Sequence, residues 1–203
     1  VAGALRAGAG RVTAVEIDPT IVYLGRTLHP EAPYSDARVQ VVVDDGRRFV
    51  ERTRDVYDLI IHGLVDSHGL FSNYSSVRLD SFLYTEQGMR AAVKRLGPHG
   101  RLVISFAVVN DWLGVRLVSL VRRVLPHVEV IRREGTFIIV GAREPLAAAP
   151  ERQIAFEDPA AFPVVANQLT DDWPFLYLRE KSVPRHYFVF VAAILLIVAG
   201  VTW

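Results

Sequence analysis

The sequence predicts an α/β fold with a mostly parallel sheet, and the alternation of apolar runs with helical segments carries this prediction. Aliphatic and β-branched residues fill three stretches that each contain a buried strand, namely Arg11–Pro19, Val39–Val43 and Tyr57–Ile61. The first two stretches pass directly into segments with helical periodicity. Repeated strand-helix alternation requires a mostly parallel sheet with helices on both faces, which excludes sandwiches and helix bundles.

Local signals place the other elements along the chain. Pro19 suits the first turn of a helix, and Thr85 can cap another. The Gly-Pro-His-Gly run at 97–100 is expected to stop that second helix and form a turn. The predicted helices cover 20–28, 46–53, 85–96 and 111–125. The later predicted strands cover 101–106 and an antiparallel pair at 128–131 and 136–141.

Carboxylates follow the first two strands at the point where each strand ends. Glu16 and Asp18 close the first stretch, and Asp44 and Asp45 come directly after the second. Open α/β folds bind ligands at the carboxyl ends of their strands, and an acid at the position of Glu16 usually accepts hydrogen bonds from a ribose diol. The sequence therefore predicts a nucleoside cleft. Asp18 and Asp45 also precede helices, where an N-cap role alone would favour them.

Four motifs at these positions together resemble those of the spermidine synthase family. In chain order they are VTAVEIDP at 12–19, HPEAP at 29–33, DARVQVVVDDGRRFV at 36–50 and YDLII at 57–61. The family consists of aminopropyltransferases that share the class I S-adenosylmethionine methyltransferase fold. The resemblance extends especially to the membrane-bound bacterial members, covers roughly residues 1–141, and implies a Rossmann-like domain.

The resemblance assigns the co-substrate side of the site. It implies that Glu16 holds the ribose hydroxyls of S-adenosylmethionine or of its decarboxylated form. It also implies that Asp45 accepts a hydrogen bond from the adenine amino group. Asp18 and Gly46, which stand close to these acids in the sequence, are assigned to the same side.

The acceptor side departs from the family pattern. Aminopropyltransferases carry Asp-x-x-Asp after the third strand; the first acid helps deprotonate the attacking amine and the second helps hold the diamine. Gly63 stands at the first of these positions, and Asp66 matches the second. An amine needs a base to lose its proton, so Asp66 or His62 is predicted to serve, with His68 as a further candidate. Tyr74 is predicted to line a polyamine pocket through a cation–π contact, the alternative being a surface tyrosine.

The first ten residues read as the end of a helix, because they are rich in alanine and stop at glycine. Gly8 and Gly10 are therefore interpreted as a helix C-cap and a short turn, not as a GxG cofactor loop. A class I fold opens with a strand and a glycine-rich turn before this helix, and neither occurs in the sequence. The chain is expected to be an N-terminally truncated fragment that lacks this central strand.

Beyond the first part, 1–142, the composition changes. Residues 143–186 are rich in proline and are interpreted as a linker and juxtamembrane segment. Within them, LTDDWPFLY at 169–177 resembles a signature of the membrane-bound family members. This aromatic segment is interpreted either as seated at a membrane interface or as a lid or docking element.

The last part, 187–203, contains no charged residue and is predicted to begin a transmembrane helix. As a helix it would rise about 25 Å against a hydrocarbon core of roughly 30 Å. Arg179, Lys181 and Arg185 precede it, so the positive-inside tendency places the α/β domain in the cytoplasm at the cell membrane.

Composition narrows the function classes further. The chain has no cysteine, which excludes disulfides, thiolate nucleophiles and cysteine-ligated metals. No metal is expected from histidine either, because only positions 62 and 68 approach ligand spacing, on one polar loop. Lysine plus arginine (23) nearly balances aspartate plus glutamate (22), so no nucleic-acid partner is predicted. A polyamine or other small acceptor and membrane lipid are the expected partners, and a homodimer is left open.

Three functions remain open. The leading one is a membrane-anchored transferase that moves an aminopropyl group from decarboxylated S-adenosylmethionine to a diamine. Its rival is a methyltransferase that uses S-adenosylmethionine itself, which the glycine at position 63 favours. The third is a catalytically silent nucleoside-binding domain that regulates a fused membrane transporter.

Overall fold

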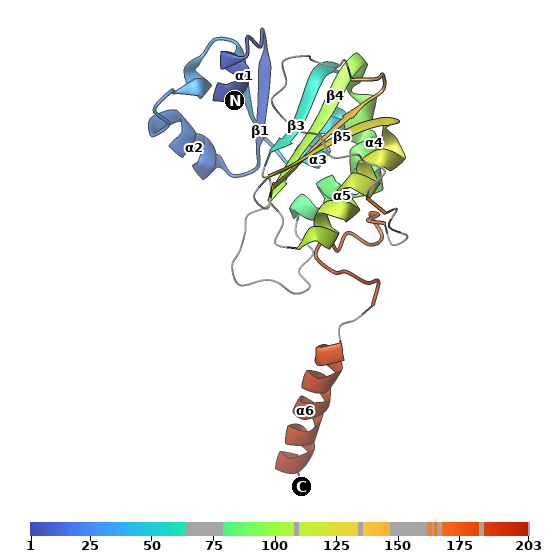
Figure 1. Cartoon of the computed structure of the whole chain (residues 1–203). Helices are drawn as coiled ribbons and strands as arrows, with labels where there is room; N and C mark the ends of the chain where they lie inside the picture. The colour runs from blue at the N-terminus through green and yellow to red at the C-terminus, as the bar shows by residue number, and fades with distance from the viewer. Residues whose placement is uncertain are drawn as a thin grey trace.

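The computed structural model of the chain describes residues 1–63, 79–107, 110–133, 136–146, 162–163, 165, 168–182 and 185–202. The strands are β1 (Val12–Glu16), β2 (Val39–Val43), β3 (Tyr57–Gly63), β4 (Leu96–Ala107), β5 (His127–Arg133) and β6 (Thr136–Ala142). The α-helices are α1 (Ala2–Arg6), α2 (Pro19–Thr27), α3 (Gly46–Arg52), α4 (Glu86–Lys94), α5 (Asp111–Val124) and α6 (Arg185–Thr202). Two 3₁₀ turns complete the order, η1 (Pro33–Ser35) and η2 (Leu79–Tyr84). Figure 1 shows α6 standing apart from the α/β part.

β1 and β2 form a parallel pair whose carboxyl ends lie together. Glu16, the last residue of β1, pairs with Val43, the last residue of β2. The crossover helix α2 starts where the sequence predicts, because the Asp18 side chain accepts a hydrogen bond from the Thr20 backbone N–H at 2.7 Å. The short helix α1 precedes β1, and Gly8 follows it with a φ of 85°, as expected of a glycine that ends a helix.

The larger sheet has the order β3-β4-β6-β5. β3 runs parallel to β4, whereas β4 with β6 and β6 with β5 are antiparallel, so the antiparallel pair predicted from the sequence is confirmed. The segment 97–100, predicted as a turn before the strand, lies inside β4 instead. Tyr57 pairs with Leu96 and Leu59 pairs with Arg101, so this segment bulges out of the ladder.

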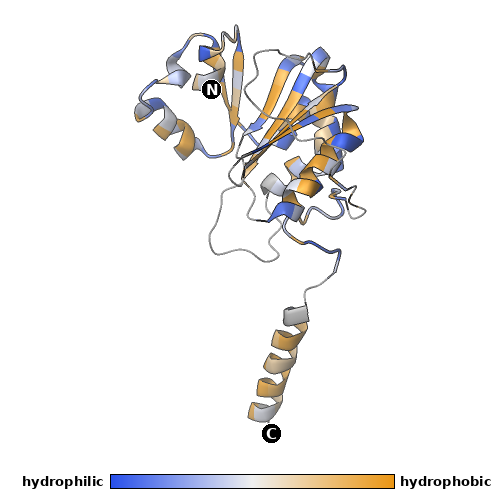
Figure 2. Cartoon of the chain, in the orientation of Figure 1, coloured by the Kyte–Doolittle hydropathy of each residue, from blue (hydrophilic) through white to orange (hydrophobic). Residues whose placement is uncertain are grey.

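Alternation along β4 shows which face of this sheet carries the core. Leu102, Ile104 and Phe106 are fully buried and belong to one cluster with the apolar side chains of α4 and α5. The residues between them in β4 are only partly buried. Figure 2 shows hydrophobic colouring along these strands and along the helices beside them. The helices α4 and α5 therefore cover this face of the sheet.

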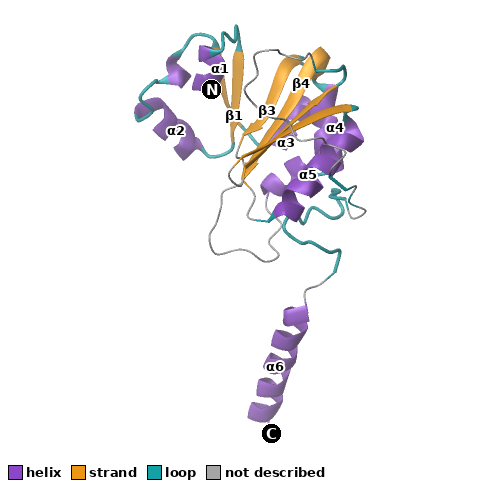
Figure 3. Ribbon diagram, viewed as in Figure 1, coloured by secondary structure: helices purple, strands orange, loops and turns teal. Residues whose placement is uncertain are grey.

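The strand pairing differs from the single, mostly parallel sheet that the sequence predicts. In the described part of the chain no pairing joins β1 to β3, so the two parallel pairs belong to separate sheets (Figure 3). Two of the four strand pairings are antiparallel, because β6 returns from β5 and inserts beside β4. The absence of the first, central strand of the class I fold from this chain stays a prediction.

The segment before α6 is more than a linker. Residues 168–179, called the strap from here on, include the buried side chains of Leu169 and Leu176. In Figure 1 the orange trace of the strap passes beside α5 and continues toward α6. None of the helices among the described residues combines the length and the apolar character that crossing a membrane requires. The transmembrane helix therefore stays a prediction.

Candidate functional site

Four carboxylates gather where β1 and β2 end. The Asp44 backbone N–H donates to the Glu16 carbonyl oxygen at 3.2 Å, which joins the two strand ends. The Glu16 Oε1 accepts from the Asp18 N–H at 3.0 Å, and the Asp44 Oδ1 accepts from the Asp45 N–H at 2.9 Å. These carboxylates therefore lie at the N-termini of α2 and α3, at the carboxyl ends of the parallel strands, where open α/β folds bind ligands.

Asp45 and Gly46 sit at the start of α3. The Asp45 side chain accepts from the Arg48 backbone N–H at 2.8 Å, so Asp45 is the N-cap. Asp18 caps α2 in the same way, and the alternative role considered for both acids is thus observed. The cap bond engages Oδ1 of Asp45, and a carboxylate can accept several hydrogen bonds. Capping and ligand binding are therefore compatible.

The turn η2 brings the ends of β2 and β3 together. A Cβ placed on Gly46 would lie 3.4 Å from the Leu83 side chain of η2. The neighbouring Tyr84 packs edge-on to His62 of β3, with 6.2 Å between the ring centroids. Gly46, which follows β2, and His62 near the end of β3 thus both border η2.

His62 lies on the core side of β3, with 6% of its surface exposed. No hydrogen-bond partner is found for its Nδ1 among the described residues. Burial lowers the pKa of His62 to about 4, because the charged imidazolium loses hydration there. The ring is therefore neutral near pH 7 and a weak proton acceptor. Its catalytic role stays a prediction.

The burial of His62 predicts a pH-dependent stability. Between its ordinary pKa of 6.5 and the lowered value near 4, the unfolded chain binds the proton and the folded chain does not. The free energy of unfolding should therefore fall as the pH drops through this window, by about 3 kcal/mol from this residue. His62→Phe should remove this part of the acid sensitivity in urea unfolding at pH 7, 5.5 and 4.5.

A matched control is His99→Phe, because the His99 side chain is 83% exposed. That variant should keep the acid sensitivity of the original chain. Equal pH dependence in the His62 and His99 variants would contradict the buried, neutral state of His62.

Gly63 ends β3 opposite Ser105 of β4. A Cβ placed on Gly63 would meet only the Ile61 side chain, at 3.6 Å, among the described atoms, which is an ordinary contact. A Cβ is therefore accommodated, among the described atoms, at the position where the family carries its first acid. Asp66, His68 and Tyr74 fall outside the described residues, so their roles remain predictions.

One part of the site was missed by sequence reasoning. The Arg47 side chain of α3 is only 15% exposed and reaches Asp171 of the strap. The Asp171 carboxylate also accepts from the Thr85 hydroxyl at 2.6 Å. Arg47 lies among several other charged residues at 44–52, so nothing in the sequence indicates that its partner is a residue as distant as Asp171. The docking alternative for 169–177 is the one that these contacts favour.

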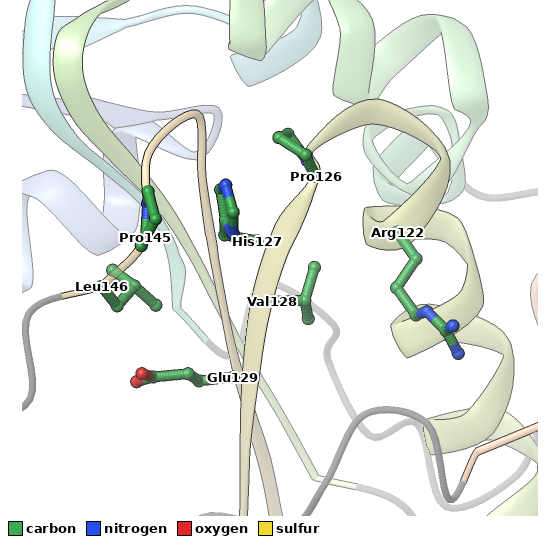
Figure 4. A pocket seen from close by; sticks show the side chains of 7 residues that line it. All are labelled: Arg122, Pro126, His127, Val128, Glu129, Pro145 and Leu146. Carbon is green, nitrogen blue, oxygen red and sulfur yellow. The ribbon is translucent and has the colours of Figure 1, made fainter.

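Among the described residues, the carboxylate edge is not a candidate metal site, and the pocket described next lies elsewhere in the molecule. Across the described ranges no group of three or more His, Asp or Glu side chains could hold a metal ion. A pocket of about 330 Å³ lies at the opposite edge, where β5 begins (Figure 4). Its lining comprises Arg122, Pro126, His127, Val128, Glu129, Pro145 and Leu146. His127 pairs with Ala142, and Ala142 pairs with Arg101 of β4. Arg101 lies near the amino end of the parallel β3–β4 ladder, so the pocket lies at the amino end of these strands.

Comparison with known proteins agrees with this geometry. Residues 7–104 match the family model of the spermine/spermidine synthase domain. The resemblance to the spermidine synthase family is confirmed. The polyamine aminopropyltransferase of Korarchaeum cryptofilum (strain OPF8) is 31% identical over 99 residues, which cover 47% of this chain and 28% of that protein. The chain thus spans less than a third of the length of the curated relatives it matches.

Two solved structures support the fold. A spermidine synthase in complex with the transition state analogue AdoDATO aligns with a TM-score of 0.54 at 16% identity, covering 88% of this chain and 60% of that one. Human methyltransferase-like protein 13 in complex with SAH aligns with a TM-score of 0.53 at 20% identity, covering 71% of this chain and 64% of that one. Both show that the α/β part of this spermidine synthase-like chain has the methyltransferase-type fold.

Proposed function

We propose that the chain acts as a spermidine synthase-like transferase that moves an aminopropyl group from decarboxylated S-adenosylmethionine to a diamine. The observation that supports this most is the joining of Glu16 to the Asp44–Asp45 turn at the carboxyl ends of β1 and β2, inside the matched synthase domain. Glu16 would hold the ribose diol, and Asp45 would accept from the adenine amino group. Asp18 and Gly46 complete this side of the site.

The charge at this edge favours the decarboxylated ligand. Decarboxylated S-adenosylmethionine carries a sulfonium and an ammonium, whereas S-adenosylmethionine adds a carboxylate. Four acids stand at the ends of β1 and β2, and of these Asp44 has Arg48 near it, at 3.8 Å. Carboxylates attract cations and repel a further carboxylate, more strongly where water is displaced. The ligand without the carboxylate should therefore bind more tightly.

The transfer needs a base as well as a nucleoside site. The lone pair of the acceptor nitrogen attacks the methylene carbon beside the sulfonium and forms the new C–N bond. The C–S bond breaks, its electron pair stays on sulfur, and methylthioadenosine leaves as a neutral thioether. The proton of the attacking amine passes to a base. We assign this step and acceptor binding to Asp66, with Tyr74 beside the diamine, because Asp66 matches the second acid of the family pattern. His62, buried in β3, is the alternative base.

The direct test supplies the full chain with decarboxylated S-adenosylmethionine and putrescine. The expected products are spermidine and methylthioadenosine in equal amounts, measured by chromatography. Nucleoside binding with neither product would favour the silent regulatory domain. A methylated acceptor formed from S-adenosylmethionine, without spermidine, would contradict the proposal.

The methyltransferase alternative has one specific observation in its favour. Gly63 supplies no carboxylate at the end of β3. Methyl transfer does not require the Asp-x-x-Asp pair that binds and deprotonates a diamine. The two activities are separated by which form of S-adenosylmethionine is consumed.

We further propose that α6 anchors the enzyme in a membrane, with lipid as its partner. Its large apolar side chains are exposed by at least half: Phe188, Val189, Phe190, Val191, Ile194, Leu195, Leu196, Ile197, Val198 and Val201. Apolar colouring also surrounds α6 in Figure 2. Exposing so large a continuous apolar surface to water is unfavourable, and burial in hydrocarbon would remove it.

The proposed anchor predicts a topology. A single cysteine is a clean probe, because the chain contains none. With Arg179, Lys181 and Arg185 on the cytoplasmic side, Glu180→Cys should resist an impermeant thiol reagent in intact cells. The same residue should react after the cells are permeabilised. Labelling of intact cells would contradict this orientation, and recovery of the chain in the soluble fraction would contradict the anchor.

A further inference from the structure

The strap is built into the α/β part at the start of α4. The Glu86 backbone N–H donates to the Leu169 carbonyl at 2.9 Å, and the Asp171 N–H donates to the Gln87 side chain at 3.2 Å. The strap thus satisfies a first-turn N–H group that has no partner within the helix. Leu169 is 1% exposed, so this end of the strap is fixed by packing as well as by hydrogen bonds.

Arg116 of α5 holds the other end of the strap. The side chain is buried, and its guanidinium donates to the carbonyl oxygens of Leu176, Leu178 and Arg179 at 2.6–3.0 Å. Burial lowers the pKa of Arg116 to about 10, which still leaves it charged at neutral pH. Trp112 lies 4.9 Å from the guanidinium carbon and adds a cation–π contact. These contacts with Arg116 therefore fix residues 176–179 of the strap against α5.

Asp171 bridges two helices from this fixed strap. One carboxylate oxygen accepts from the Thr85 hydroxyl at 2.6 Å, and the other accepts from the Arg47 guanidinium at 3.2 Å. Thr85 is the N-cap of α4, and its hydroxyl accepts from the Gly88 N–H at 3.1 Å. Arg47 is the second residue of α3. The Asp171 carboxylate thus ties the first turn of α3 to the first turn of α4.

Gly88 lets Arg47 approach this closely. A Cβ at Gly88 would lie 2.8 Å from the Arg47 Nη1 and 2.5 Å from the Phe82 carbonyl oxygen. A larger residue would therefore push the guanidinium away from Thr85 and Asp171. At Gly46, by contrast, a Cβ would make only an ordinary contact with Leu83 of η2, at 3.4 Å. Gly88 is therefore the glycine that this close approach requires.

We infer that Asp171 is a positioning residue for the nucleoside site. The bridge through Arg47 fixes the start of α3, and Asp45 and Gly46 lie directly before Arg47 in the chain. The inference rests on the proposed function, in which Asp45 accepts from the adenine amino group. Losing the bridge should move Asp45 relative to η2 and weaken recognition of that amino group more than binding of the ribose.

The test compares two ligands that differ at the adenine amino group. The dissociation constants of 5′-methylthioadenosine and 5′-methylthioinosine are measured by calorimetry on the full chain, on Asp171→Asn and on Asp172→Asn. The original chain should prefer the adenosine ligand by about tenfold or more, on the scale of one hydrogen bond to a charged group. Asp171→Asn should lower this preference at least threefold, whereas Asp172→Asn, at the next position of the strap, should keep it.

An unchanged preference in Asp171→Asn would overturn the positioning role. If Asp171→Asn does not fold, Arg47→Gln breaks the same bridge from α3, and an unchanged preference there would overturn it equally. A plain loss of stability would weaken both ligands together and leave their ratio unchanged, which also contradicts the inference. An original chain that binds both ligands equally would instead remove the Asp45 assignment on which the proposed function depends.

Discussion

Gly63→Asp should raise the rate of spermidine formation by about 10²-fold, because a positioned general base contributes about 10²–10⁴-fold to proton transfer. The substitution restores the first acid of Asp-x-x-Asp at the end of β3. Among the described atoms, a Cβ at this position would make only an ordinary contact with Ile61. Initial rates with decarboxylated S-adenosylmethionine and putrescine would measure the change.

Gly63→Asn is the matched control, because it has the same shape as aspartate without the negative charge. It should leave the rate within a few-fold of that of the original chain. Equal rates in the aspartate and asparagine variants would show that the base assigned to Asp66 already suffices and that a second acid at position 63 adds nothing. Asp66, and then His62, would be the next residues to replace.

Glu16→Ala should weaken nucleoside binding by about 1.5–3 kcal/mol, or roughly 10- to 150-fold, the usual scale for a hydrogen bond to a charged group. The Glu16 Oε1 already accepts from the Asp18 N–H, so the carboxylate is held in place before a ligand arrives. Preorganisation of this kind lowers the cost of binding. Calorimetric titration with methylthioadenosine would give the affinity of each variant.

Glu144→Ala is the control for this prediction. Glu144 is 57% exposed and pairs with His99, which belongs to the bulge of β4 far from its carboxyl end. Its loss should leave nucleoside affinity unchanged. Unchanged affinity in Glu16→Ala as well would contradict the assignment of the ribose acid.

The placement of Glu16 and Asp45 at strand ends could be predicted from the sequence because its signals are local; their ligand roles stay predictions. Glu16 and Asp45 each follow an apolar strand and adjoin a helix start, so a few neighbouring residues determine where they lie. Thr85 as a helix cap and Gly8 as a helix end are also local features, and the structure confirms both.

Other features depend on residues that are distant in the chain. Asp171 lies 124 residues from Arg47, and no periodicity or motif links the two positions. The separation of β1–β2 from the larger sheet likewise depends on which strands find partners. The Gly-Pro-His-Gly run at 97–100 predicts a turn that ends pairing. In the structure β4 pairs with β3 on both sides of this run, so the run forms a bulge within the strand. Local propensity alone does not encode these pairings.

Direct titration of the full chain with decarboxylated and intact S-adenosylmethionine tests the central claim, that the acidic edge formed by β1 and β2 binds the aminopropyl donor. The account predicts that the decarboxylated form binds at least about tenfold more tightly, a difference of about 1.4 kcal/mol, because it carries no carboxylate toward Glu16 and Asp44. Equal or tighter binding of S-adenosylmethionine would contradict the account and favour methyl transfer.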